Sequence, residues 1–447
     1  MKRFFCAPLF CVLALAPAGG VTLSLADEQA RALVNSPEIG AAVAALSAAE
    51  KNAAVSRSAL YPTVNLEGQG YYQTTVFQIQ TPAPMNFSAS LGNNWNYTVG
   101  PAAYWTLWDF GDKRFGYRAA EQVLEAKRRE LDSVKRNVLL GVRSAYFKTM
   151  LALDQVYLSG NFLKLAVEQY DDTVKKARAG DKTRLDVLQF RQEVYSRRKM
   201  YIAARRELSE NLNGLFALTG EGADHDTAFP SDERLGGSVF EDVSGSTFYA
   251  GAEKFDTLDA AMSPAEKKNA ADKNPALLSL AAIVKNYELA EKQAEAKRWL
   301  AVQSYAKAQL AFPKGPADIS FNQNVAGVNV SMPLWDDGRT KNSAAAQGAL
   351  ANNYRQQYNR ARRDIFRDFE TAREELAALR EQLLTDKKAQ AEAEEIAGLV
   401  YKMYETGQRT YLDVQNANVR ALSAGVETAR TQAQILLQLA LIDSLGD

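Results

Sequence analysis

The single histidine of the chain, His225, stands between two aspartates and is the first candidate for metal or acid–base chemistry. Adjacent side chains seldom point at one ion, so we interpret Asp224-His225-Asp226 as a solvated loop and expect no metal site. Two cysteines, Cys6 and Cys11, complete the inventory of soft ligands. Zinc sites of the Cys/His kind and histidine-based catalysis therefore have almost no candidate residues.

Other catalytic signatures are also missing. Gly68-Gln69-Gly70 begins like a dinucleotide fingerprint but lacks the rest of the motif. No nucleophile–base pair or phosphate-binding loop stands out, so we expect neither an enzyme nor a cofactor. Lys+Arg and Asp+Glu are both 53. This charge balance argues against a nucleic-acid partner, which requires a basic excess to neutralise phosphates.

The N-terminal residues have the composition of an export signal. Two basic residues precede a short apolar stretch, and the small residues at 16 and 18 fit a cleavage site. Residues 1–18 are therefore predicted to be a signal peptide. A lipoprotein signal at Cys11 is the alternative, although the bulky Phe10 directly before it is wrong for lipidation. Cleavage would leave a mature chain without cysteine, held by its core or by assembly.

The chain contains an internal duplication. Leu-Trp-Asp-Phe-Gly at 107–111 matches Leu-Trp-Asp-Asp-Gly at 334–338, an offset of 227 residues (334 minus 107). Gly180 and Gly407 match at the same offset. Tyr61 and Trp299 match at an offset of 238 residues (299 minus 61). A period this long indicates a duplicated domain rather than a solenoid.

The duplication predicts the domain organisation. A first repeat at 19–220 and a second repeat at 257–447 are joined by an inter-repeat segment at 221–256. Each repeat is expected to contain a helix, a β-hairpin and a long helical hairpin. We place the β-hairpins at 63–108 and 301–334.

Long proline-free tracts predict the helical hairpins. No proline occurs from 102 to 229 or from 334 to 447, and proline is costly inside helices. Within the first tract a helix is predicted at about 113–178, with Gly180 ending it and Gly407 ending its counterpart. Heptad spacing of apolar and small residues favours coiled-coil packing. The clearest row is Leu131, Val138, Ala145, Ala152, Ser159 and Ala166.

Four segments alternate in polarity and predict strands at 64–76, 94–108, 302–312 and 324–334. Soluble half-buried hairpins are one interpretation. Their length and the aromatic residues near their ends favour transmembrane strands instead. Lipid-facing strands must close into a barrel, and four strands are too few. A membrane location therefore requires an oligomer, in which two copies would give a filled lumen and three could leave an open pore.

The order and spacing of these motifs resemble the TolC family of outer-membrane efflux proteins over nearly the whole mature chain. The matching segments are 24–28 and 35–38 for the opening helix and its break, 59–62 for the helix-to-strand proline, 333–339 for the strand-to-helix signature and 407–414 for the inner-helix turn. The resemblance implies a mixed α/β membrane protein. Three copies, with four strands per chain, would form a 12-stranded transmembrane β-barrel continued by a long α-helical coiled-coil tunnel. The inter-repeat segment and the C-terminal tail would help to form an equatorial belt.

The resemblance also implies a function and a location. The homotrimer would lie in the lipid of the cell outer membrane, with the helical tunnel in the periplasm. It would export drugs, other small molecules or proteins, as in type I secretion, and would work with a periplasmic adaptor and an inner-membrane pump. A soluble periplasmic coiled-coil scaffold or adaptor is the alternative, although it has no need for aromatic-flanked strands.

The resemblance finally implies a gate at the periplasmic aperture. The matching residues are Asp186, Tyr404 and Arg409, which would link inner and outer helices and keep the resting tunnel closed. Simple capping of the helix turn is the alternative role. Asp413 would form a ring of three carboxylates at the pore constriction and favour cations, unless it only caps its helix or pairs with Arg409. Asn416 leaves the position of a second ring neutral.

Overall fold

The computed structural model describes residues 22–80, 88–90, 92–220, 251–267, 269, 272–315 and 317–446. The predicted signal peptide, His225, most of the inter-repeat segment and the loop at 81–84 lie outside the described residues. Two compact units are present, and each draws on both repeats. The sheet unit comprises the described residues of 40–134 and 272–364, and the helical unit comprises the described residues of 1–39, 135–271 and 365–447.

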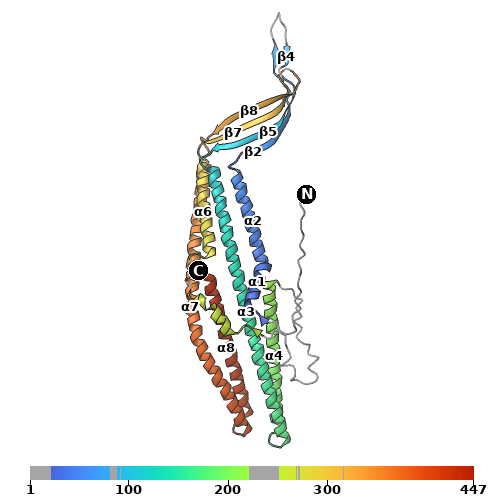
Figure 1. Cartoon of the computed structure of the whole chain (residues 1–447), viewed down its shortest axis with the longest axis vertical. Coiled ribbons are helices and arrows are strands. Elements are labelled where there is room, and N and C mark those ends of the chain that lie inside the picture. The colour runs from blue at the N-terminus through green and yellow to red at the C-terminus, as the bar shows by residue number, and fades with distance from the viewer. Residues whose placement is uncertain are drawn as a thin grey trace, which may run out of the picture. The chain divides into compact units, whose positions relative to one another are not determined.

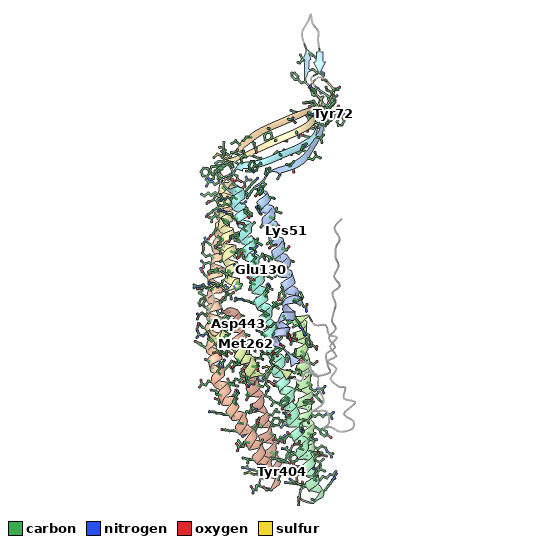
Figure 2. All side chains as sticks on the ribbon, viewed as in Figure 1. Lys51, Tyr72, Glu130, Met262, Tyr404 and Asp443 are labelled. Atoms are coloured by element: carbon green, nitrogen blue, oxygen red, sulfur yellow. The ribbon has the colours of Figure 1, made fainter. Side chains whose placement is uncertain are left out.

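A four-stranded antiparallel sheet is the main feature of the sheet unit (Figure 1). Its strands, in spatial order, are β2 (Thr63–Tyr72), β5 (Trp95–Trp108), β7 (Ala301–Phe312) and β8 (Phe321–Ser331). The two repeats meet at the centre, where Tyr104 of β5 lies opposite Tyr305 of β7. Figure 2 shows Tyr72 at the end of this sheet that is remote from the helices of the same unit. A short ribbon of β3 (Gln78–Gln80) and β4 (Ser88–Ser90) extends the first hairpin.

Two strand ends differ from the prediction. The first strand stops at Tyr72 rather than at residue 76, because a side-chain bond interrupts the regular ladder at Gln73 and Asn94 before β3 and β4 continue the hairpin. The Gln73 N–H donates to the Asn94 carbonyl at 2.8 Å, and Nδ2 of the Asn94 side chain donates to the Gln73 carbonyl at 2.9 Å. The last strand runs from 321 to 331 rather than from 324 to 334. Its final residue pairs with the first residue of β7, and Pro333 has no N–H to continue the ladder.

The two faces of the sheet differ sharply in polarity. On one face Val64 and Leu66 are 71% and 80% exposed. The other face carries a polar network that crosses three strands. Tyr104 Oη donates to Glu67 Oε1 at 2.7 Å, and Lys307 Nζ donates to Glu67 Oε2 at 3.1 Å. The alternation read in the sequence is therefore present, with the apolar side chains unpartnered within the described residues.

Helices make up the rest of both units. Helix α3 spans Asp112–Arg178 and confirms the helix predicted at about 113–178. The other helices are α1 (Leu25–Asn35), α2 (Pro37–Ser58), α4 (Arg184–Thr219), α5 (Phe255–Met262), the 3-10 helix η3 (Ser263–Lys267), α6 (Pro275–Ala296), α7 (Arg339–Glu405) and α8 (Tyr411–Leu445). In the part of the chain that the structure describes, no single helix is long and apolar enough to cross a membrane. Only α1 and α2 taken together, bent by 44° where they meet, satisfy the length and composition criteria.

The core of the helical unit follows the heptad rows. Val138, Ala152 and Ala166 of α3 are buried, as the spacing predicts. One cluster joins Leu163 and its neighbours on α3 to Val194 on α4. The C-terminal half of α8 is buried as well, through Ile435, Leu436, Leu439 and Ile442. Burial of such side chains supplies most of the stability of a helix, because isolated helices are marginal in water.

Polar contacts hold the non-helical segments of the helical unit. Strand β1 (Thr22–Leu23) pairs in parallel with β6 (Gly251–Ala252). Tyr146 of α3 is buried beneath them, where its hydroxyl donates to the Leu23 carbonyl at 2.8 Å and accepts from the Glu253 N–H at 3.3 Å. Asp443, labelled in Figure 2, pairs with Arg143 at 2.5 Å and ties the end of α8 to α3. The start and end of the described chain are thus anchored to one helix.

Candidate functional site

The candidate site is built on two helix turns with the same backbone. Gly180 ends α3 and Gly407 ends α7, with φ of 93° and 81°. Each turn closes with the pair of hydrogen bonds typical of a Schellman motif. In the first turn the Asp181 N–H donates to the Lys176 carbonyl, and in the second the Gln408 N–H donates to the Met403 carbonyl. Both glycines therefore end their helices, as predicted, and the structure places them in the left-handed conformation that favours glycine.

Identical capping boxes start the two returning helices. Thr183 Oγ1 accepts from the Asp186 N–H, and the Asp186 carboxylate accepts from the Thr183 N–H at 2.9 Å. Thr410 and Asp413 repeat this arrangement at the start of α8, also at 2.9 Å. Both aspartates thus serve as caps. For Asp413, the capping role that the sequence left open is present, and its place in a pore stays a prediction.

The symmetry between the turns ends at Tyr404. This residue of α7 is only 5% exposed, and its hydroxyl donates to Asp186 Oδ1 at 3.4 Å. The corresponding residue of the first repeat is Ala177, 227 positions earlier, which has no side chain to reach Asp413. One contact therefore crosses from the second-repeat hairpin to the first-repeat turn, and it has no mirror image.

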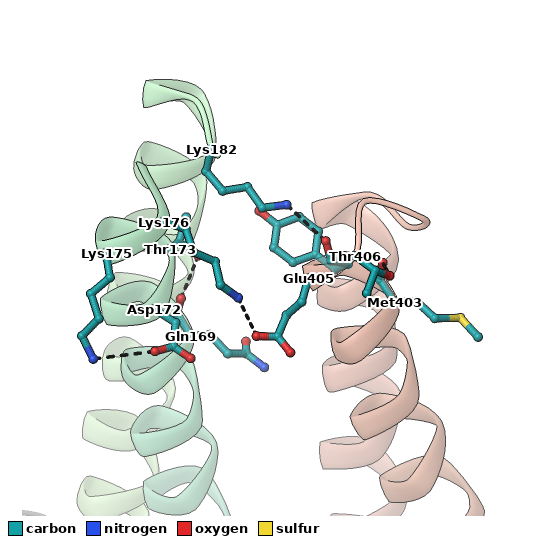
Figure 3. Close-up of polar contacts among 10 residues, drawn as sticks. Gln169, Asp172, Thr173, Lys175, Lys176, Lys182, Met403, Glu405 and Thr406 are labelled. Carbon is teal, nitrogen blue, oxygen red and sulfur yellow. Dashed lines mark hydrogen bonds and ion pairs between the residues drawn. The ribbon is translucent and has the colours of Figure 1, made fainter. Parts of the chain in front are cut away.

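Lys182 strengthens the same crossing. Its ammonium donates to the Tyr404 carbonyl at 3.1 Å and lies 3.8 Å from the centroid of the Tyr404 ring. A second ion pair joins Lys176 of α3 to Glu405 of α7 at 2.5 Å. Figure 3 shows both lysines extending from the first hairpin toward the end of the second. A cation over an aromatic face adds about 0.5–1 kcal/mol at an exposed site.

An aromatic cluster packs beneath these polar contacts. Phe190 of α4 is fully buried, and its ring centroid lies 5.4 Å from that of Tyr404 and 4.8 Å from that of Tyr411. The residue matching Phe190 in the second repeat is Ala417. Phe190 and Tyr404 thus each correspond to an alanine in the other repeat, whereas Tyr411 corresponds to Arg184. This difference in side-chain size between matching positions of the two repeats lets the two hairpins pack together.

The electrostatics keep both aspartates ionised. Partial burial raises the pKa of Asp186, but hydrogen bonds from Thr183, the nearby Lys182 ammonium and the bond from Tyr404 outweigh it, so this pKa lies below its ordinary value. The backbone and hydroxyl bonds from Thr410 lower the pKa of Asp413. Burial raises the pKa of Tyr404 to about 12, and the Asp186 charge adds to this effect. The Tyr404 hydroxyl is therefore a permanent hydrogen-bond donor at neutral pH.

The remaining predicted site residues lie apart from this contact. Arg409 is exposed and makes no hydrogen bond or ion pair with any described residue. Asn416 is exposed on the second turn of α8. The structure therefore brings together Asp186 and Tyr404 but not Arg409. Among the described residues there is also no group of three or more metal-ligating side chains.

Sequence reasoning missed Lys182 and Phe190. The repeat alignment could have found Lys182, because it lies 227 positions before Arg409 and carries the same charge. Phe190 has no such signal, because the corresponding residue of the second repeat is Ala417. Its role depends on packing against another hairpin. Their contacts belong to the same small region as Tyr404.

The comparison with known proteins decides the family. The outer membrane efflux protein family model matches residues 30–221 and 268–446. The chain belongs to this family. This membership confirms the predicted location, the cell outer membrane with a helical periplasmic part, and the expected resemblance to TolC-like efflux channels.

Individual relatives agree with the assignment. The "Pyoverdine export outer membrane protein OpmQ" of Pseudomonas aeruginosa is 28% identical over 201 residues, which are 43% of this chain and 40% of OpmQ. The match thus spans less than half of that relative. Vibrio cholerae VceC has a TM-score of 0.72 at 18% identity, covering 94% of this chain and 96% of VceC. Neisseria gonorrhoeae MtrE has a TM-score of 0.70 at 18% identity, covering 100% and 98%. At these identities the two structures establish the fold.

Proposed function

We propose that the chain is one subunit of a homotrimeric export channel in the outer membrane. Three copies would each contribute four strands to a 12-stranded barrel, and their helical hairpins would form the tunnel that continues it. The observation that carries this proposal is the sheet itself. Strands β2 and β8 each lack a second neighbour among the described residues, and one face is apolar and exposed. Open edges are costly in hydrocarbon, so such a sheet requires closure by other copies.

We further propose that the cargo is a small molecule. OpmQ is named for pyoverdine export, and the family is one of efflux proteins. The channel would receive its cargo from an inner-membrane pump through a periplasmic adaptor. The alternative of a soluble scaffold or adaptor leaves the exposed apolar face of the strands without a purpose. No chemistry on the cargo is part of this function.

The paired turns are proposed to close the periplasmic aperture. Tyr404 and Lys182 would hold the second hairpin against the first. There, Asp186 accepts a hydrogen bond from the Tyr404 hydroxyl. Arg409, exposed and unpaired among the described residues, would bind a neighbouring subunit, and Asp413 and Asn416 would line the constriction. An exposed pair contributes only about 0–1 kcal/mol, so threefold repetition gives a lock that a partner can release. The structure of MtrE is described as an open state, which supports a channel with more than one state.

Cysteine cross-linking tests the barrel, because the mature chain is predicted to contain no cysteine of its own. Leu66→Cys on β2 would be combined with cysteine at successive outward positions of β8, beginning with Val328→Cys. We expect a covalent trimer on a denaturing gel after oxidation in membranes. The control places the second cysteine on the central strand β5 at Trp105, where only contacts within one chain form. A protein that stays monomeric and remains in solution without detergent contradicts the proposal.

A further inference from the structure

A cavity of 410 Å³ lies where β8 leads into α7, within the sheet unit. This volume is within the range of about 300–1,000 Å³ that is usual for small-molecule sites. Its lining includes Arg298, Met332, Leu334, Trp335, Asp337 and Lys341. Leu334 and Trp335 are 91% and 86% exposed, so the apolar part of the cavity is covered by nothing in the described chain.

The cavity continues the apolar face of the sheet. Val328 and Val330 are exposed on that face of β8, and Met332, two residues further on, is exposed and lines the cavity. In the proposed channel this face contacts lipid. The cavity then lies at the end of the strands, at the depth where a bilayer changes from acyl chains to headgroups.

Three of the four charged side chains of the cavity are unpaired among the described residues. Arg298, Lys341 and Asp337 are exposed, and none forms a hydrogen bond or ion pair with another described residue through its side chain. Asp336 is different, because its two oxygens accept from the Gly338 and Thr340 N–H groups at 3.0 Å and start α7. Two cations and one carboxylate therefore remain available to a ligand.

The first repeat shows that two of these charges, those of Arg298 and Asp337, are not required by the turn. Phe110 corresponds to Asp337, and both adopt a left-handed backbone, with φ of 53° and 50°. Phe110 packs on Trp108 and Trp299 instead of presenting a charge. Leu60 corresponds to Arg298, 238 positions later. Arg298 and Asp337 thus have no charged counterpart in the first repeat, whereas Lys341 corresponds to Arg114.

We propose that this cavity binds a phosphatidylethanolamine-type lipid. Its phosphate binds Arg298 and Lys341, its primary ammonium binds Asp337, and its acyl chains lie along the apolar face that ends at Met332. A zwitterionic headgroup matches the charges of the cavity, whereas a phosphate alone would leave Asp337 unpaired beside it. This inference rests on the proposed channel function, which places this end of the sheet at the membrane surface.

Lipid binding to the detergent-purified protein tests the inference. Native mass spectrometry would compare dioleoyl phosphatidylethanolamine with phosphatidylcholine, whose methylated ammonium donates no hydrogen bond, and with phosphatidylglycerol. We expect phosphatidylethanolamine to bind about fivefold more tightly than either, the effect of one exposed charge pair. Asp337→Asn tolerates the left-handed backbone, and we expect it to abolish the preference over phosphatidylcholine. Arg298→Gln with Lys341→Gln should weaken binding of all three lipids.

The first repeat supplies the matched control. Arg114 corresponds to Lys341, and Arg114→Gln should leave all three affinities unchanged. Equal binding of the three lipids by the wild type overturns the inference, and so does a preference that survives Asp337→Asn. Failure of the channel proposal would be seen separately, as the absence of a cross-linked trimer.

Discussion

The two helix turns of the chain share a backbone but differ in what holds them. Both carry a left-handed glycine and a Thr–Asp capping box. Asp186 also accepts a bond from Tyr404 of the other repeat, and Lys182 donates across to the same residue. Asp413 and Arg409, their counterparts, make no hydrogen bond outside their own turn among the described residues. Duplication therefore supplied the shape of the site, and divergence of a few side chains supplied its closing contact.

The largest expected effect comes from the packing that joins the two hairpins. Phe190→Ala removes a fully buried ring, and we expect a loss of about 3–5 kcal/mol in the free energy of unfolding. Leu188→Ala, two residues earlier on the exposed side of the same helix, is the control and should cost much less. Thermal or denaturant unfolding of the purified protein, followed by circular dichroism, measures both. Equal losses would show that Phe190 does not join the hairpins.

The shared feature of the two turns gives the next prediction. Thr183→Ala and Thr410→Ala each remove a cap, so each should cost about 1 kcal/mol of stability. The two losses should be the same within error, because the hydrogen-bond geometry is the same. Denaturant midpoints of the two variants make the comparison. A much larger loss for Thr183→Ala would mean that the cap and the Tyr404 contact are coupled.

Acid should affect the two turns differently. Both aspartates have a lowered pKa, so each stabilises the folded turn above its ordinary pKa and loses that effect as pH falls through the folded value. We therefore expect channel conductance to rise only below about pH 4. Asp186→Asn should conduct more at neutral pH and respond less to acid, whereas Asp413→Asn should keep the response. An acid response lost only in Asp413→Asn would reverse these roles.

The smallest expected effect concerns charge at the constriction. Three Asp413 carboxylates around one axis would favour cations, and the neutral Asn416 adds no second ring. Asp413→Ala should therefore shift the reversal potential toward the value expected for a pore that does not select between cations and anions. It should also weaken block by trivalent cations. Asp413→Asn separates the loss of charge from the loss of the cap. If reversal potential and block do not change in either variant, Asp413 is a cap only.

Sequence reasoning reached the elements that follow a periodic pattern. The heptad rows and the proline-free tract predicted α3 nearly to the residue, and Gly180 marked its end. The strand ends were less accurate, because the alternation continues past Tyr72 while a side-chain bond between Asn94 and Gln73 interrupts the ladder. A polarity pattern does not record such a bond. Pro333 was a visible reason to end β8 earlier.

The candidate site could be predicted from the sequence only in part, for the same reason. Asp186 and Tyr404 could be named from the family resemblance, and the structure places them in contact. Lys182 and Phe190 act across two hairpins that are more than 200 residues apart in sequence (404 minus 190). No local period records such a contact. The exchange of Tyr404 for Ala177 becomes meaningful only when both repeats are placed side by side.

Single-channel conductance in planar bilayers tests the central claim, that the crossing at Tyr404 keeps a channel closed. Tyr404→Phe with Arg409→Ser removes one hydroxyl and one charge and leaves the buried ring and the helices in place. We predict a several-fold rise in conductance over the wild type, with Tyr404→Phe alone giving part of it. The control is Tyr195→Phe, an exposed tyrosine of α4, which should conduct like the wild type. A double variant that forms trimers and conducts no better than the wild type would contradict the account.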